Sequence, residues 1–154
     1  MESFEITFFS LRDQYDKDTI NIIANQFKKY DIFQKRSTVE LFCYEDKDFV
    51  EFCISIFDFT LTAGNLEYVM TKISQFVSSV LESVDDIFLA VGIYELTHYL
   101  TENIRYINEF DDNFTRKFPF VFFRKGRLFD SGRTIYNDEN VICVFNENAQ
   151  SIYL

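Results

Sequence analysis

Hydrophobic and polar positions in the first half of the chain repeat with two different periods, and each period predicts an element. Residues 3–11 (SFEITFFSL) are rich in β-branched and aromatic side chains, which favours a strand. Between residues 18 and 33 the apolar side chains recur at helical spacing. Residues 37–45 and 49–60 alternate, and the short polar linker between them predicts a β-hairpin.

The clearest helix is predicted over residues 65–82. Its apolar side chains recur every three or four positions along one face: Leu66, Val69, Met70, Ile73, Phe76, Val77, Val80 and Leu81. Residues 87–100 suit either a helix or a strand. We favour a strand, because the helix before it is complete and Val91 and Ile93 are β-formers.

These elements give the order β-α-β-β-α-β over residues 3–100. The order predicts an α+β fold in which two helices cover one face of an antiparallel sheet, in a ferredoxin-like βαββαβ arrangement. A polar, acidic connector (103–113) then precedes further strands that extend the sheet, one of them near Val141–Phe145. The length suits one hydrophobic core, so we expect a single acidic globular domain over residues 1–154.

The amino-acid composition predicts which side chains form the core and where in the cell the protein is found. Twenty Phe and nine Tyr, with no Trp, predict a core built largely of phenylalanine and aliphatic side chains. Cys43, Cys53 and Cys143 are odd in number and sit in strand-like runs, so we expect buried, reduced thiols. No basic leader and no apolar run of membrane-spanning length is evident. The expected location is the cytoplasm, without contact with a membrane.

Nucleophilic catalysis by a Ser/His or Cys/His pair would have to use His98, the only histidine, as its base. The 25 acidic residues always offer some carboxylate pair, and a solvated acidic face is the default interpretation for them. On a helix, Glu95, His98 and Glu102 would share a face, and Glu-x-x-His is half of a di-iron site. That site needs a second histidine, and on a strand Glu95 and His98 point to opposite faces. Nucleophile motifs, glycine-rich phosphate loops and metal-ligand spacings are absent from the sequence. We therefore expect no enzyme activity, no cofactor and no metal.

The charge pattern is more informative, because the chain has a formal net charge of -10. Residues 82–112 contain eight acidic side chains and only one basic side chain, Arg105. Such a cluster either keeps a surface soluble or attracts a cationic partner. The candidate partner-binding residues are the eight acids themselves: Glu82, Asp85, Asp86, Glu95, Glu102, Glu109, Asp111 and Asp112.

Residues 116–133 have the opposite character, with six basic side chains and one acid. Aromatic side chains beside Arg and Lys can stack on nucleic-acid bases, which makes an RNA-binding module one alternative. A run of phenylalanines such as Phe118–Phe123 suits a buried strand better than an open platform, and Pro119 suits an edge strand. We expect Arg124, Lys125 and Arg127 to pair with the chain's own carboxylates and expect no direct contact with nucleic acid.

These features favour a small cytosolic inhibitor that binds a basic protein. In general character the chain resembles the immunity proteins of bacterial polymorphic toxin systems, which are compact and need no catalytic set. The resemblance implies that the protein neutralises a basic toxin or nuclease by occluding its active site. The alternatives are a small-molecule-binding or enzymatic ferredoxin-like domain that uses His98 and Glu95, and an RNA-binding module that uses residues 116–133.

Overall fold

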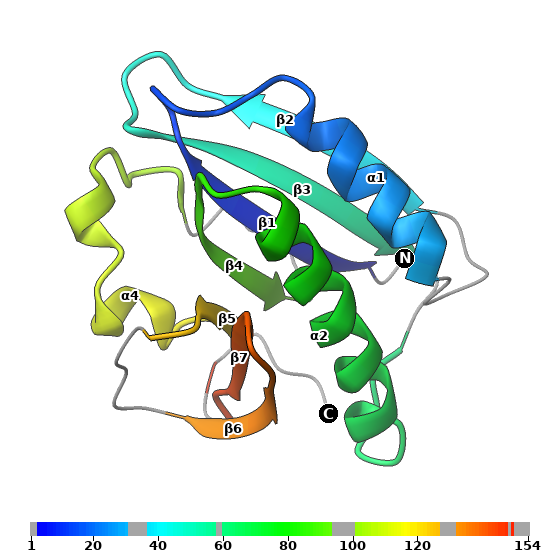
Figure 1. Cartoon of the computed structure of the whole chain (residues 1–154). Coiled ribbons are helices and arrows are strands. Elements are labelled where there is room, and N and C mark those ends of the chain that lie inside the picture. Colours follow the sequence, from blue (N-terminus) through cyan, green and yellow to red (C-terminus); the bar gives the residue numbers. More distant parts are fainter. Residues whose placement is uncertain are drawn as a thin grey trace.

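The computed structural model describes residues 3–30, 37–57, 60–93, 101–126, 132–147 and 149. The strands are β1 (Ser3–Leu11), β2 (Ser37–Cys43), β3 (Phe49–Phe57), β4 (Ile87–Ile93), β5 (Phe120–Arg124), β6 (Arg133–Asn137) and β7 (Val141–Phe145). The helices are α1 (Thr19–Tyr30), α2 (Leu66–Ser83) and the short α4 (Asp112–Thr115), with one 3-10 turn, η1 (Ile107–Glu109) (Figure 1).

The strands form one seven-stranded sheet in the order β2-β3-β1-β4-β5-β7-β6. The six pairings between described strands are all antiparallel. β1 lies in the middle of the first four strands, where it pairs with β3 and β4. The predicted α+β fold with an antiparallel sheet, the hairpin and both long helices are therefore confirmed, whereas the ferredoxin-like arrangement stays a prediction.

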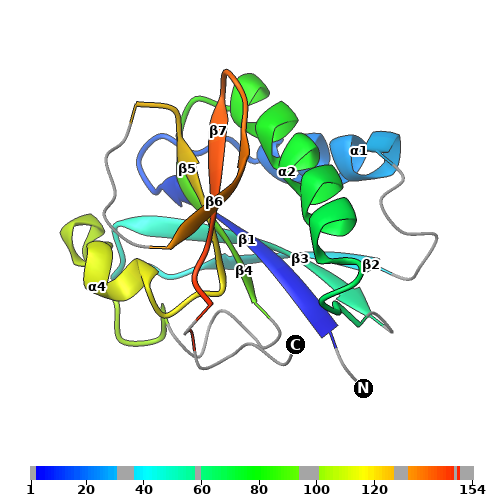
Figure 2. The same ribbon diagram turned by 90° about the horizontal axis from the view of Figure 1, so that it is seen from below.

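Helices α1 and α2 cover one face of this sheet, as Figures 1 and 2 show. Alternate residues of β1, among them Phe4 and Phe8, are fully buried in the core on this side. The ring of Phe76 on α2 packs edge-to-face against Phe8, with 5.8 Å between ring centroids, and against Phe27 of α1 at 5.4 Å. The apolar stripe predicted for α2 is thus the face that contacts the sheet.

The opposite face of the sheet has a second, smaller core, which includes part of the phenylalanine run predicted to be a buried strand. Phe110, Phe114 and Phe118 are buried there, and successive ring centroids in this row are 5.0 and 5.2 Å apart. Phe110 also packs against Phe9 and Phe49, at 4.9 Å from each ring. The segment predicted to be a polar connector therefore contains residues that cover this face.

Arg124, at the end of β5, is held by backbone carbonyls rather than by the carboxylates that the sequence predicted. Its Nε donates to the carbonyl of Ile87 at 2.6 Å, and one terminal nitrogen donates to Leu81 at 3.0 Å. The other terminal nitrogen donates to Val84, the C-cap of α2. Burial lowers the pKa of Arg124, and nearby Asp85 acts in the opposite direction. One side chain thus joins α2, β4 and β5.

Two details of the sequence interpretation were wrong. Cys43 is exposed, because β2 stands at the end of the strand order, whereas Cys53 and Cys143 are buried as expected. Burial raises the pKa of Cys143 to about 12, so this thiol stays protonated. Pro119 precedes a strand that lies between two others, β4 and β7, so β5 is not an edge strand.

Replacing Val77 with aspartate tests the burial of α2. Val77 is fully buried, so Val77→Asp places an unpaired charge in the core and should lower the free energy of unfolding by about 3 kcal/mol or more. Urea unfolding measures the change. The matched control is Tyr68→Asp on the exposed face of the same helix, where a change within about 0.5 kcal/mol is expected. Equal effects would contradict the assigned orientation of α2.

A second stability prediction concerns Arg124. Arg124→Met keeps much of the apolar stem but leaves the three carbonyls without their donor, which should cost about 2 kcal/mol or more. Arg116→Met, at an exposed position, controls for the loss of one positive charge. Thermal and urea unfolding of both variants at the same ionic strength would separate the two effects. A loss no larger than that of the control would show that water replaces the guanidinium.

Candidate functional site

Three loops leave the sheet at the same end because β1 runs antiparallel to both β3 and β4. The last residue of β1, Leu11, is paired with Phe49, the first residue of β3. The amide of Arg12 donates to the carbonyl of Asp48 at 2.8 Å. The amide of Leu11 donates to the carbonyl of Asp86 at 3.2 Å. The β1–α1 loop, the β2–β3 turn and the α2–β4 turn therefore lie side by side.

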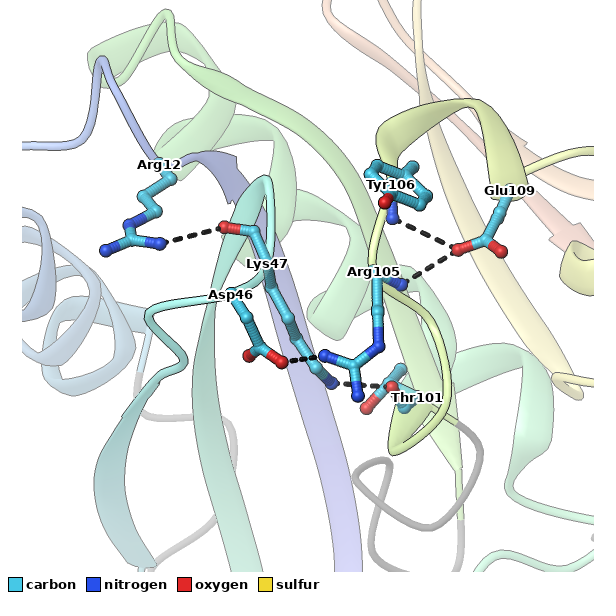
Figure 3. Close-up of polar contacts among 7 residues, drawn as sticks. All are labelled: Arg12, Asp46, Lys47, Thr101, Arg105, Tyr106 and Glu109. Carbon is cyan, nitrogen blue, oxygen red and sulfur yellow. Dashed lines mark hydrogen bonds and ion pairs between the residues drawn. The ribbon is translucent and has the colours of Figure 1, made fainter.

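A fourth segment, residues 101–109, folds back to the same end, as Figure 3 shows beside the β2–β3 turn. The amide of Asp48 donates to the carbonyl of Arg105 at 2.9 Å, and the amide of Ile107 donates to the Asp48 carboxylate at 3.3 Å. Arg105 also forms an ion pair with Asp46. The β2–β3 turn and the 101–109 segment are thus joined by backbone and side-chain contacts.

The buried side chain of Lys47 links the β2–β3 turn to the 101–109 segment. The ammonium of Lys47 donates to the carbonyl of Thr101 at 2.7 Å and lies 4.3 Å from the centroid of the Tyr44 ring. The Thr101 hydroxyl donates in turn to Glu51 at 2.7 Å. Burial lowers the pKa of Lys47, although Glu51 acts in the opposite direction. These contacts thus hold the β2–β3 turn against the start of the 101–109 segment (Figure 3).

The tip of the fourth segment is held by one carboxylate. The amides of Arg105 and Tyr106 both donate to Oε2 of Glu109, at 2.8 and 3.0 Å. These two hydrogen bonds lower the pKa of Glu109. The side chain of Tyr106 next to this carboxylate is 58% exposed, and that of Ile107 is 39% exposed.

The four segments carry most of the net charge of the protein. Residues 11–18, 44–48, 82–86 and 101–109 contain eleven acidic and four basic side chains, a net charge of -7 against -10 for the whole chain. We call these four segments the acidic end. Charges of one sign gathered on neighbouring loops produce a stronger local field than the same charges spread over a surface.

The eight acids predicted from the sequence fall into three groups. Glu82, Asp85 and Glu102 are exposed on the acidic end. Asp86 and Glu109 lie on the same end, but both carboxylates accept hydrogen bonds from their own chain, Asp86 from the buried hydroxyl of Ser10. The remaining predicted acids are Asp111 and Asp112 at the start of α4, and Glu95, which lies outside the described residues.

Asp111 and Asp112 belong to the start of α4 rather than to the acidic end. The Asp111 carboxylate accepts the amide of Phe114 at 2.9 Å and so caps this short helix. Asp112 occupies its first turn, where a negative charge is favourable. Both residues therefore have a local role that explains why an acid stands there.

Sequence reasoning missed the acids that come from the first two loops. Asp13, Glu45, Asp46 and Asp48 precede residue 82, so a count along the chain separates them from the later cluster. The register of β1 with β3 and β4 brings the two sets together. Only the strand pairing carries that information.

Two hollows open on the acidic end. The larger, of about 490 Å³, is lined by Leu11, Arg12, Asp13, Gln14, Glu45, Asp46, Lys47, Asp48 and Ile107. The smaller, of about 390 Å³, lies between the start of α1 and the end of α2 and is lined by Gln14, Asp16, Thr19, Ile22, Ser83, Val84, Asp85 and Asp86. Carboxylates predominate among the charged groups of both, which suits cationic groups.

The part of the chain that the structure describes offers no group of three or more His, Cys, Asp or Glu side chains placed to hold a metal ion. His98 and Glu95, the candidates for catalysis, lie outside the described residues. Within the same described ranges, no helix is both long and apolar enough to cross a membrane. Comparisons with protein-family models, curated proteins and solved structures find no match to this chain.

Two adjacent acids of the α2–β4 turn should respond differently to mutation. Asp86→Ala removes an acceptor of the buried Ser10 hydroxyl and should cost about 1 kcal/mol or more. Asp85→Ala, at an exposed position with the same change of charge, should stay within about 0.5 kcal/mol of the parent protein. Urea titrations at one ionic strength report both values. Equal losses would mean that the turn responds to charge alone.

Proposed function

We propose that this protein is a binding inhibitor that docks a strongly basic protein on its acidic end. The convergence of four acidic segments at one end of the sheet carries the proposal. Clustered exposed carboxylates attract a cationic surface over a distance and suppress binding to anionic partners. The exposed members that would make first contact are Glu45, Glu82, Asp85 and Glu102.

The mechanism we propose is occlusion. In a nuclease, Lys and Arg side chains of the active site bind phosphate groups, and a rigid set of carboxylates can occupy the same positions. A basic toxin or nuclease is therefore the proposed partner, and the protein would serve as a cytoplasmic immunity protein in a bacterium. The order in the β2–β3 turn and the 101–109 segment supports this mechanism, because a preorganised surface loses little entropy on binding.

The RNA-binding alternative is not favoured by the position of the aromatic run. Phe118, Phe120, Phe122 and Phe123 are all buried, so their rings are not available to stack on bases. Arg124 is held by three carbonyls of the same chain. Within the described part of this stretch, the phenylalanines thus belong to the core and Arg124 binds the end of α2.

Charge reversal tests the proposal. We compare two double variants of equal charge, Glu82→Lys/Asp85→Lys on the acidic end and Glu67→Lys/Glu147→Lys away from it; all four residues are exposed. Affinity capture from the native host should recover a basic protein with the parent chain and with the distant variant. The acidic-end variant should recover much less, because attraction becomes repulsion at the contact surface.

Association kinetics with the captured protein give the decisive readout. Exposed charges are screened beyond a Debye length of about 8 Å at physiological ionic strength, so salt should slow association of the parent chain far more than it speeds dissociation. The acidic-end variant should associate more slowly and depend less on salt than the distant variant. Identical behaviour of the two variants would reduce the effect to net charge and would refute a localised docking surface.

A further inference from the structure

An exposed apolar pair lies within the acidic end. Among the described residues, four large hydrophobic side chains are exposed: Leu41, Tyr68, Tyr106 and Ile107. Leu41 lies alone on β2, and Tyr68 lies alone on α2. Tyr106 and Ile107 are consecutive and sit on the tip of the 101–109 segment. Tyrosine is enriched among the residues that dominate binding energy at protein interfaces.

The backbone beneath this pair is fixed on both sides. Glu109 accepts the amides of Arg105 and Tyr106, and Asp48 accepts the amide of Ile107. The Arg105 carbonyl accepts the amide of Asp48, and the Arg105 side chain is paired with Asp46 (Figure 3). Solvent-exposed apolar side chains on a held backbone need little ordering when they bind, which favours affinity.

The larger hollow begins directly beside this pair, since Ile107 forms part of its lining. Asp13, Glu45, Asp46 and Asp48 supply four carboxylates to the same lining, against Arg12 and the buried Lys47. The Arg12 side chain donates to the carbonyl of Lys47 at 3.4 Å and keeps its positive charge, so four carboxylates face two cationic groups in this lining. The hollow therefore combines an apolar wall with negative charge.

We infer that Tyr106 and Ile107 are the apolar anchor of the interface and that the hollow beside them receives a lysine or arginine side chain of the partner. The inference rests on the proposed function, because it names the contact that gives the docked complex its lifetime. The partner segment it fits is a protein segment in which a large apolar residue neighbours a basic one. Phosphate-bearing ligands are disfavoured by the surrounding carboxylates.

The apolar anchor is expected to slow dissociation, which the exposed charges do not do. The exposed carboxylates accelerate encounter and lose effect in salt, whereas buried apolar contact slows dissociation and resists salt. The two contributions can therefore be separated by kinetics. Removal of the anchor should change the dissociation rate and leave association nearly unchanged.

A blocked tripeptide serves as the first probe. Acetyl-Arg-Leu-Arg-amide is added stepwise to the ¹⁵N-labelled protein, and the chemical shifts of the backbone amides are followed by NMR. The uncharged peptide acetyl-Gln-Leu-Gln-amide is titrated in the same way. The charged peptide should move the amides of 11–14, 45–48 and 105–107 in a saturable manner. The neutral peptide should bind more weakly at the same positions. Shifts confined to other parts of the chain, or no shifts at 105–107, would overturn the inference.

Matched double variants complete the test. Tyr106→Ala/Ile107→Ala removes the anchor, and Leu41→Ala/Tyr68→Ala removes an exposed tyrosine and an exposed aliphatic residue elsewhere. The anchor variant should bind both the charged peptide and the captured basic protein about fivefold or more weakly than the control, with the loss in the dissociation rate. Binding equal to the control would overturn the anchor and leave the proposed function standing. Loss of the proposed function would instead show in the charge-reversal variants.

Discussion

The hydrogen bonds of Arg124 are the constraint on which the acid-rich turn after α2, one of the four segments of the acidic end, depends. α2 ends without a basic residue in its last turn, although Glu82, Asp85 and Asp86 lie at or just after that end. Carboxylates near the negative pole of a helix are unfavourable, and the last carbonyls of the helix lack partners within it. Arg124 supplies both the positive charge and the donors from β5. An acid-rich turn can therefore succeed α2 without destabilising it.

Carboxylates on this protein perform two different tasks. Asp48, Asp86 and Glu109 accept hydrogen bonds from their own chain and so determine how the loops lie together. The exposed acids, such as Asp85 and Glu102, contribute to the field outside the molecule. Exposed charge pairs contribute little to stability, so the second set is free to change without loss of the fold. The position of each carboxylate, rather than the number of acids, separates the two tasks.

Local pattern predicted most of the elements described up to residue 93 and fewer of those described in the C-terminal third. The strand over residues 3–11 and the helix over 65–82 were predicted within one residue at each end, because period and burial agree there. β6 was missed, since its five residues (RTIYN) are mostly exposed and show no strong apolar alternation. Phe110 lies in the segment predicted to be a polar connector (103–113), because the acids near it concealed its spacing of four from Phe114 and Phe118, whereas the burial of Phe118 was predicted. The position of the acidic end depends on strand pairing, which no local pattern encodes.

The long sequence separation between Arg124 and its acceptors also affects the order in which the elements fold. Leu81 and Arg124 are 43 positions apart, so the end of α2 lacks this donor until β5 is in place. β4 likewise acquires β5 as its second neighbour only at that stage. During synthesis, a nascent chain that has emerged only to β4 would present that strand as an open edge, which invites pairing with other chains. Folding that depends on such distant contacts is slow, so the open edge of β4 would persist until β5 pairs with it.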